Sequence, residues 1–348
     1  MRNRMMLVGL TFAAYGCSSA GDHTTATTNT PGANADLAGT SSNDNNNNGD
    51  GNSDGGSSNG NGGGGDMECG GQEFALTRIP PNVMLVLDRS GSMSDAIASG
   101  SKTTKYADLT SAMKSLVSTY DAQMRLGATF FASDNNCGAG TPGAIAAANG
   151  QSILAAVAAH SPGGNTPTAT TLDAVIQSKA LTDATRANYV VLATDGEPNC
   201  GDTDVTSRIT KLYGATPSVS TFVIGIGAAT NTDPTLLNAW ADAGHTARSG
   251  ATHYYQTNSS ADLMAAFDAI AGGIVSCDFQ MTEAAPDPTL ITVTENGTPV
   301  SPSPTVGYTY DPATNTVTLH GAACDALKND ASTKVSVVYG CPGPPPIS

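Results

Sequence analysis

The chain has 348 residues, with 30 acidic and 15 basic side chains and a formal net charge of −15. A chain this acidic is repelled by phosphate backbones and by anionic lipid surfaces, so the composition argues against nucleic-acid binding and against electrostatic attachment to membranes. Cations and cationic surfaces are the expected partners.

The first 17 residues, MRNRMMLVGLTFAAYGC, have the layout of an export signal. Two arginines precede an apolar run from Met5 to about Tyr15, which is too short to span a bilayer. The segment resembles a bacterial lipoprotein signal, in which Cys17 would be diacylated and become the mature N-terminus. A plain secretory signal is the alternative, because Ala14 stands where such signals usually have leucine and Tyr15 is large for its place.

This export signal predicts a location in the bacterial cell envelope. If Cys17 carries lipid, Ser18 beside it indicates sorting to the outer membrane or the cell surface, and the lipid would be the membrane contact. Residues 18–66 are nearly all Gly, Asn, Ser, Asp, Thr and Ala. Such a segment lacks the large apolar side chains that offset the entropy of ordering, which predicts a disordered linker.

Between Asn82 and about Ile274, short apolar runs alternate with segments whose apolar residues recur every three or four positions. This alternation predicts an α/β fold with a doubly wound, mostly parallel, six-stranded sheet flanked by helices. The expected strands are 82–88, 125–131, 144–148, 189–194, 220–225 and 252–256. The expected helices are 106–120, 151–160, 168–179, 203–212, 234–243 and 260–274.

Polar side chains follow the carboxyl ends of these strands, where open α/β sheets bind ligands. The run VMLVLDRSGSM ends the first strand and contributes Asp88, Ser90 and Ser92. The loop GGNTPTATTL supplies Thr166, and the segment VVLATDGEPNCGD at the end of the fourth strand supplies Asp195. All five carry hard oxygen donors, which suit Mg²⁺, Mn²⁺ or Ca²⁺ and suit zinc or copper poorly.

The motifs around these residues resemble the metal-ion-dependent adhesion site of the von Willebrand factor A domain family. In that family a DxSxS motif follows the first strand, a threonine comes from a middle loop, and an aspartate follows the fourth strand. DRSGSM, GNTPT and ATDGE match these elements in the family's order, within a region from roughly Cys69 to Cys277. The resemblance implies a Rossmann-like fold with a cation site at one edge of the sheet.

The resemblance also implies a role for each residue of the motifs. Ser90, Ser92 and Thr166 would bind the metal directly, whereas Asp88 and Asp195 would hold it largely through bound waters. Neutral direct ligands leave the cation undercompensated, so a carboxylate from a partner protein would complete its coordination. Mg²⁺ is the expected cation, with Mn²⁺ and Ca²⁺ as alternatives.

The cysteines fit an exported chain with disulfide bonds. Setting Cys17 aside leaves six of the seven cysteines. Six cysteines permit 15 pairings, and the sequence does not choose among them. The organisation of the chain favours the set Cys69–Cys277, Cys137–Cys200 and Cys324–Cys341. The first would bracket the domain, the second would join two loops on the metal-bearing edge, and the third would hold the C-terminal segment. The alternative is that Cys137 pairs elsewhere and the site is more mobile.

After Cys277 the sequence shows strand and turn patterns without a clear helix. The expected strands are 290–295, 307–311, 316–320 and 334–339, and Asn296-Gly297 predicts a hairpin turn. The predicted organisation is therefore a signal peptide (1–17), a linker (18–66), a von Willebrand factor A domain (67–277) and a small disulfide-bonded β module (278–348).

These features together predict a protein that is not an enzyme and acts in metal-dependent adhesion or protein–protein recognition. An envelope scaffold whose metal is only structural is the first alternative. A metal-dependent hydrolase or a subunit of a metal-handling complex is the second. The sequence shows no motif that would place a catalytic base beside the five residues, which weighs against hydrolysis.

Overall fold

The computed structural model describes residues 72–340, with the exception of 228–232 and 331. The predicted signal peptide, the lipid attachment point Cys17 and the predicted linker lie outside the described residues, as do Cys69 and Cys341. Among the described residues, no helix is long and apolar enough to cross a membrane.

Six strands form one sheet in the order β5-β4-β3-β6-β7-β8. The central pairs β4–β3, β3–β6, β6–β7 and β7–β8 are parallel, and only the short β5 at the edge pairs antiparallel with β4. The six strands are β3 (Asn82–Asp88), β4 (Arg125–Phe131), β5 (Ala146–Ala147), β6 (Asn188–Thr194), β7 (Val219–Ile226) and β8 (Tyr255–Thr257).

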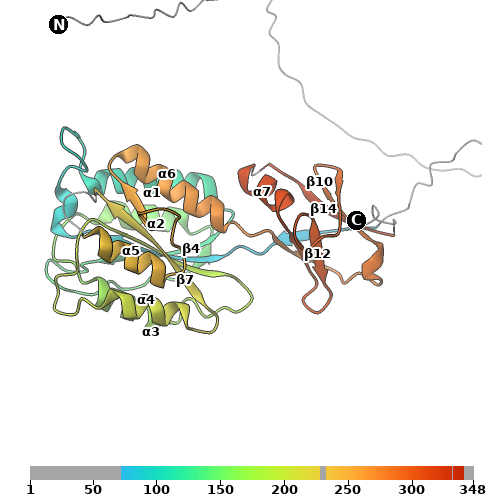
Figure 1. The fold of residues 1–348 in the computed structure, drawn as a ribbon, viewed down its shortest axis with the longest axis horizontal. Helices are drawn as coiled ribbons and strands as arrows, with labels where there is room; N and C mark the ends of the chain where they lie inside the picture. Colours follow the sequence, from blue (N-terminus) through green and yellow to red (C-terminus); the bar gives the residue numbers. More distant parts are fainter. Residues whose placement is uncertain (1–71, 228–232, 331, 341–348) are drawn as a thin grey trace, which may run out of the picture. The chain divides into compact units, whose positions relative to one another are not determined.

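Helices cover both faces of this sheet (Figure 1), with α1, α2 and α6 on one face and α3, α4 and α5 on the other. The six helices are α1 (Lys105–Tyr120), α2 (Gly150–Ala159), α3 (Thr168–Ser178), α4 (Val205–Tyr213), α5 (Pro234–Ala243) and α6 (Ser260–Ile274). The α/β architecture expected from the sequence is therefore present.

Strand β3 shows why the opening apolar run folds in the middle of the sheet. All seven of its residues are buried. Leu85 and its alternate neighbours pack against α1, α2 and α6, whereas Met84 and Val86 pack against α3, α4 and α5. A strand covered on both faces must be apolar at successive positions, and it delivers its last residue, Asp88, to the carboxyl edge of the sheet.

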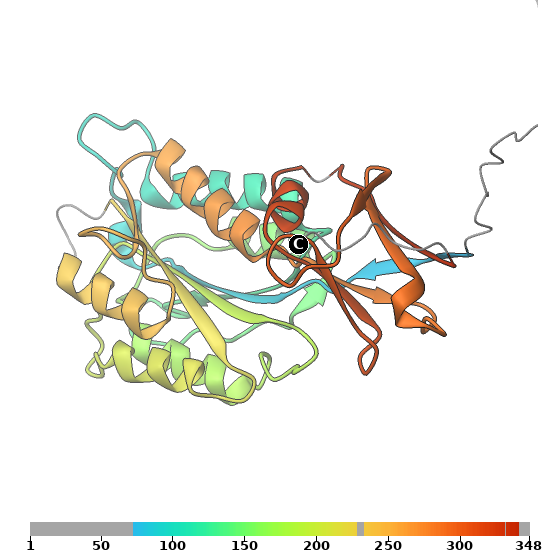
Figure 2. The ribbon, with the colours of Figure 1, turned by 45° about the vertical axis from the view of Figure 1, so that its right-hand side comes forward.

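The C-terminal part of the chain forms two four-stranded antiparallel sheets, ordered β1-β14-β10-β11 and β12-β13-β9-β2. Figure 2 shows the blue N-terminal strands among the orange and red C-terminal ones. The strands are β1 (Gln72–Phe74), β2 (Leu76–Arg78), β9 (Asp278–Met281), β10 (Ile291–Glu295), β11 (Thr298–Val300), β12 (Tyr308–Asp311), β13 (Thr316–Leu319) and β14 (Val335–Tyr339).

This pairing changes the expected division of the chain. The prediction assigned residues from 67 onward to the α/β domain, but β1 pairs with β14 and β2 pairs with β9. Phe74 is buried in the same apolar core as Val293 and Val337. The α/β domain is thus inserted between two early strands of the β module and the rest of that module.

The expectation of no helix after Cys277 was wrong, because α7 (Ala322–Asn329) lies there. Gly321, at a positive φ of 54°, turns the chain into this short helix. Ala323 and Leu327, four residues apart, face the core of the β module. Eight residues of mostly small side chains carry too little periodicity to be recognised from the sequence.

The same helix explains which cysteines pair. Cys137–Cys200 is present as predicted. Cys277 is bonded to Cys324 with a Cα–Cα distance of 5.6 Å, so the predicted Cys69–Cys277 and Cys324–Cys341 bonds are wrong. Helix α7 places Cys324 beside the residue that precedes β9, a proximity that could not be anticipated without the helix.

Candidate metal centre

Asp88 lies at the end of β3 and is completely buried. Its Oδ1 accepts the N–H of Ser90 at 2.7 Å, and its Oδ2 accepts the hydroxyl of Thr194 at 2.6 Å. Burial, and then the negative charge of Asp195, raise the pKa of Asp88 to about 7, against the opposing effect of these hydrogen bonds. A cation bound next to Asp88 would favour its ionised form.

Two hydroxyl groups converge on the second aspartate, which follows β6. Ser92 Oγ donates to Asp195 Oδ1 at 2.8 Å, and Ser90 Oγ lies 3.5 Å from the same oxygen. The two serine oxygens are 3.2 Å apart. Asp195 is fully buried, so the hydroxyls face a carboxylate that is shielded from water.

Thr166 reaches this cluster from the loop before α3. A Cβ atom added to Gly196 would lie 3.9 Å from both Ser92 Oγ and Thr166 Oγ1, so the two hydroxyls face the same glycine. Asn199 holds the threonine backbone, because its side-chain oxygen accepts the N–H of Thr166 at 2.8 Å. The N–H of Gly91 donates to the carbonyl of the same loop at Gly164, at 2.9 Å.

All five residues predicted from the sequence therefore lie together at one edge of the sheet, although their metal-binding role stays a prediction. Their donors are carboxylate and hydroxyl oxygens, the set that hard divalent cations prefer. In the described part of the chain, no three His, Cys, Asp or Glu side chains form a cluster suited to a metal. The donor set fits a cation bound by hydroxyls and two carboxylates.

Lys105 belongs to this cluster and was not predicted. Its Nζ donates to Asp195 Oδ2 at 2.7 Å, and its side chain is only 3% exposed. In the sequence it is one residue ahead of an expected amphipathic helix, where lysines are usually solvated. No local pattern predicts its burial, because the groups around Lys105, Asp195 after β6 and Gly227 after β7, are distant in sequence.

Arg89, inside the DxSxS motif, was also missed. Its guanidinium donates to three carbonyl oxygens: those of Ala132, Ser161 at 2.6 Å and Asp134 at 3.0 Å. These acceptors lie in the loops after β4 and after α2. Arg89 therefore ties both loops to the segment that carries Ser90.

The Cys137–Cys200 disulfide supports the threonine loop from both sides. Next to Cys137, the carbonyl of Asn136 accepts the N–H of Asn165 at 2.8 Å. Next to Cys200, Asn199 accepts the N–H of Thr166. The disulfide thus links the two segments whose asparagines, Asn136 and Asn199, hold Asn165 and Thr166.

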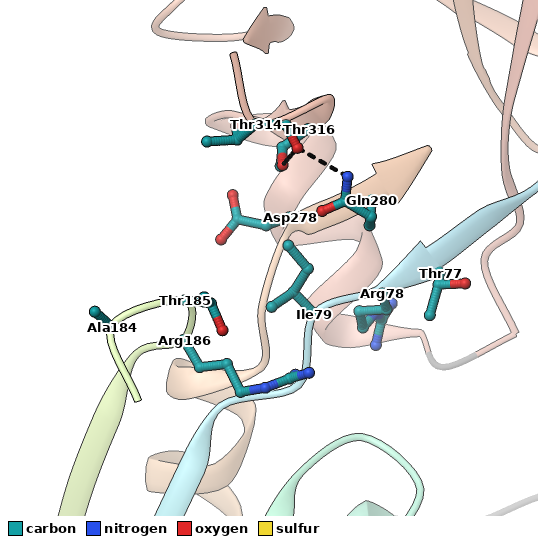
Figure 3. A pocket seen from close by; sticks show the side chains of 10 residues that line it. All are labelled: Thr77, Arg78, Ile79, Ala184, Thr185, Arg186, Asp278, Gln280, Thr314 and Thr316. Carbon is teal, nitrogen blue, oxygen red and sulfur yellow. Dashed lines mark hydrogen bonds between the residues drawn. The ribbon is translucent and has the colours of Figure 1, made fainter. Parts of the chain in front are cut away.

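A hollow of about 740 Å³ lies at the opposite edge of the sheet (Figure 3). Arg78 and Arg186, which precede the amino ends of β3 and β6, line it together with Asp278. Arg78 donates to Gln123, Arg186 donates to a backbone carbonyl, and Asp278 accepts the hydroxyl of Thr318. These charged groups are already engaged, and none belongs to the oxygen cluster, which consists of Asp88, Ser90, Ser92, Thr166 and Asp195.

The family model of the von Willebrand factor type A domain matches residues 82–269, which is 188 of the 348 residues. The chain belongs to this family. The matched region begins with β3 and ends inside α6, so it covers the six-stranded sheet and leaves β1, β2 and the other strands of the β module outside the von Willebrand factor A domain.

The solved structures that match the chain share little sequence with it. Proximal thread matrix protein 1 from the mussel byssus, with a zinc-occupied MIDAS motif, is 16% identical over 60% of this chain and 50% of its own, with a TM-score of 0.44. The pilus adhesin SpaC from Lactobacillus rhamnosus GG is 16% identical over 76% and 39%, with a TM-score of 0.45.

A von Willebrand factor type A protein from Catenulispora acidiphila is 14% identical, over 80% of this chain and 67% of its own, with a TM-score of 0.41. The chain spans about half the length of the mussel protein. A comparison with curated protein sequences finds no match.

Proposed function

We propose that this protein binds a divalent cation at Asp88, Ser90, Ser92, Thr166 and Asp195 and uses it to recognise a partner protein. The observation that carries the proposal is the convergence of two serine hydroxyls on the buried Asp195, with a threonine hydroxyl facing the same glycine. Membership of the von Willebrand factor type A family, in which metal-dependent adhesion is known, supports the same function.

Neutral hydroxyls at a cation explain how recognition would work. Ser90, Ser92 and Thr166 would hold the metal, and Asp88 and Asp195 would supply negative charge from a buried position. A bound cation supplies a Lewis-acidic position that takes an oxygen ligand. A carboxylate on the partner is the ligand proposed. Mg²⁺ is the proposed cation because it takes oxygen donors and usually keeps several water ligands, one of which a carboxylate can replace.

A binding role is proposed in preference to a catalytic one. The side chains of the four histidines in the described region are engaged away from the oxygen cluster, with Ala156, Tyr213, Asp242 and Thr309 as their partners. Among the described residues, no histidine is therefore held beside the cluster as a base. The proposed location is the bacterial cell envelope, with Cys17 as the lipid attachment point of an exported chain.

Isothermal titration of the full chain with Mg²⁺, combined with thermal unfolding, tests the cation site. We expect saturable binding and a rise in melting temperature in the wild type, because the cation binds the folded state selectively. The Asp88→Ala/Asp195→Ala variant, compared at matched fold content by circular dichroism, is expected to show neither. Wild-type protein that folds and binds no Mg²⁺, Mn²⁺ or Ca²⁺ would rule the proposal out.

A further inference from the structure

Lys105 is a buried cation, and its side-chain acceptor among the described residues is one oxygen of the buried Asp195. Its Nζ lies 2.7 Å from Asp195 Oδ2, and the two side chains are 3% and 0% exposed. Burying an ammonium group costs several kcal/mol, which the attraction to one carboxylate repays only partly. A lysine in this position therefore needs an explanation beyond the stability of the fold.

The helix that carries Lys105 does not provide that explanation. Lys105 is the first residue of α1, after the N-cap Thr104. Cations are unfavourable at this end, because the helix dipole places partial positive charge there. Helix stability alone would favour an acidic or neutral residue.

The surrounding chain nevertheless fixes the lysine in place. The N–H of Lys105 donates to the carbonyl of Asp95 at 2.8 Å. Gly227, at a φ of 67°, lies against the lysine stem, where an added Cβ would come within 3.0 Å of Cε. The end of β7 and the loop before α1 thus enclose the side chain and direct its ammonium group towards Asp195.

Asp195 uses its two oxygens for different partners. Oδ1 accepts the hydroxyl of Ser92 at 2.8 Å, on the side of the oxygen cluster. Oδ2 accepts the ammonium group of Lys105. The carboxylate of Asp195 therefore lies between the candidate cation site and the ammonium group of Lys105.

The charge count then decides what the site attracts. Counted by formal charge, Asp88 and Asp195 contribute −2 and Lys105 contributes +1. A divalent cation would neutralise a site that held the two carboxylates alone. With Lys105 included, the cation-bound site has one net positive charge. A positively charged site in a low-dielectric setting favours an anionic ligand over a neutral one.

We propose that Lys105 is a positioning residue that makes the loaded site selective for a carboxylate, at the expense of cation affinity. This inference rests on the proposed function. It holds that Lys105, a residue outside the motifs, determines the class of ligand that the site prefers. Lys105 opposes the incoming cation by charge repulsion through Asp195. After the cation is bound, the charge of Lys105 leaves the site with one excess positive charge. A carboxylate ligand neutralises this charge, whereas a neutral amide or hydroxyl does not.

The test measures two affinities in the full chain, with Mn²⁺ and acetate as probes. Electron paramagnetic resonance follows free Mn²⁺, and water-proton relaxation follows the displacement of metal-bound water by acetate. Lys105→Met removes the charge and keeps the length of the stem, and Lys105→Gln is a second variant with a polar tip. Lys102→Met is the matched control, because Lys102 is an exposed lysine in the preceding loop.

We expect both Lys105 variants to bind Mn²⁺ about tenfold more tightly and acetate about tenfold more weakly, in line with the loss of one nearby charge. Lys102→Met should change each affinity less than about twofold, because solvent screens an exposed charge. Wild-type protein should prefer acetate over the neutral acetamide, which needs no variant to measure.

Three results would overturn the inference: affinities that move in the same direction, affinities that do not move, or equal binding of acetate and acetamide by the wild type. Each of these results requires that wild-type protein binds Mn²⁺, so each leaves the proposed cation site standing. Wild-type protein that binds no Mn²⁺ would overturn the proposed function as well as the role of Lys105.

Discussion

Asp88 is a fully buried carboxyl group whose ionisation is costly until a cation is bound. Burial and the charge of Asp195 raise its pKa to about 7, from 3.8. Two hydrogen bonds, from the N–H of Ser90 and the hydroxyl of Thr194, fix the orientation of the carboxyl group. The fold therefore holds Asp88 in place for a ligand that compensates its charge.

This raised pKa predicts a pH dependence of stability in protein stripped of metal by EDTA. A group with a raised pKa stabilises the fold fully below its unfolded pKa, and this contribution is lost as the pH rises through about 7. The free energy of unfolding in urea should therefore fall between about pH 4 and pH 7, by on the order of a few kcal/mol. Asp88→Asn should lose most of this slope, and an equal slope in that variant would contradict the assignment to Asp88.

The threonine hydroxyl offers a test of a single metal ligand. Thr166→Val removes the hydroxyl and keeps the shape, so we expect Mg²⁺ affinity to fall about tenfold or more, with little change in melting temperature without metal. The control is Thr168→Val in the same segment, because the Thr168 hydroxyl is buried without a partner in the structure. Calorimetry that shows the same loss in both variants would refute a direct role for Thr166.

The motifs in the sequence identify five residues of the cluster but miss two charged ones. Asp88, Ser90 and Ser92 are readable because a short motif follows a buried strand directly. Lys105 and Arg89 are not readable, because a lysine or arginine near the start of a helix or in a loop is usually solvated. Their burial follows from the packing of loops that are distant in sequence.

Among the helices and strands, long periodic elements are predictable and short ones are not. The expected bounds of β3, β4, α5 and α6 agree with the structure. Clear boundary signals flank α5, since Asp233 caps its N-terminus and Gly244 follows its C-terminus. Strands β1 and β2 have three residues each and depend on partners more than 200 residues away, a pairing that no local pattern reveals.

The two disulfides allow a matched test of how loops support the site. Cys137→Ser/Cys200→Ser should lower the free energy of unfolding by about 4 kcal/mol on the chain-entropy model for a separation of 63 residues. It should also weaken Mg²⁺ binding, because the loops that carry Asn136 and Asn199, which hold the threonine loop, are then no longer linked. Affinity is measured by calorimetry below the unfolding transition.

The control for this pair is Cys277→Ser/Cys324→Ser in the β module. Its separation of 47 residues predicts a similar loss of stability, about 4 kcal/mol. Because this bond lies away from the oxygen cluster, Mg²⁺ affinity should stay unchanged. Equal losses of affinity in the two double variants would show that general destabilisation, and not the loop contacts, sets the affinity.

Considered as a whole, the chain is a β module interrupted by a von Willebrand factor A domain. Strands β1 and β2 form one edge of each four-stranded sheet, and Phe74 contributes to the module core. The chain thus enters and leaves the α/β domain through the same module. This arrangement was not predicted, because the stretch between the predicted linker and Asn82, residues 67–81, contains only a few apolar residues.

This arrangement predicts that the β module depends on residues before the α/β domain. Removing residues 1–78 should expose its core and make residues 278–340 sensitive to limited proteolysis, whereas removing residues 1–71 should not. Mass spectrometry of the fragments identifies the cleaved region. Equal protection of residues 278–340 in both truncated proteins would contradict the contribution of β1 and β2.

The most direct measurement is an anomalous diffraction map of crystals of the protein grown with Mn²⁺. We predict one strong peak within coordination distance, about 2.0–2.4 Å, of the hydroxyl oxygens of Ser90, Ser92 and Thr166, with Asp88 and Asp195 close by. A peak at another cluster, or well-ordered hydroxyls with no peak at saturating Mn²⁺, would contradict a cation site at this edge of the sheet.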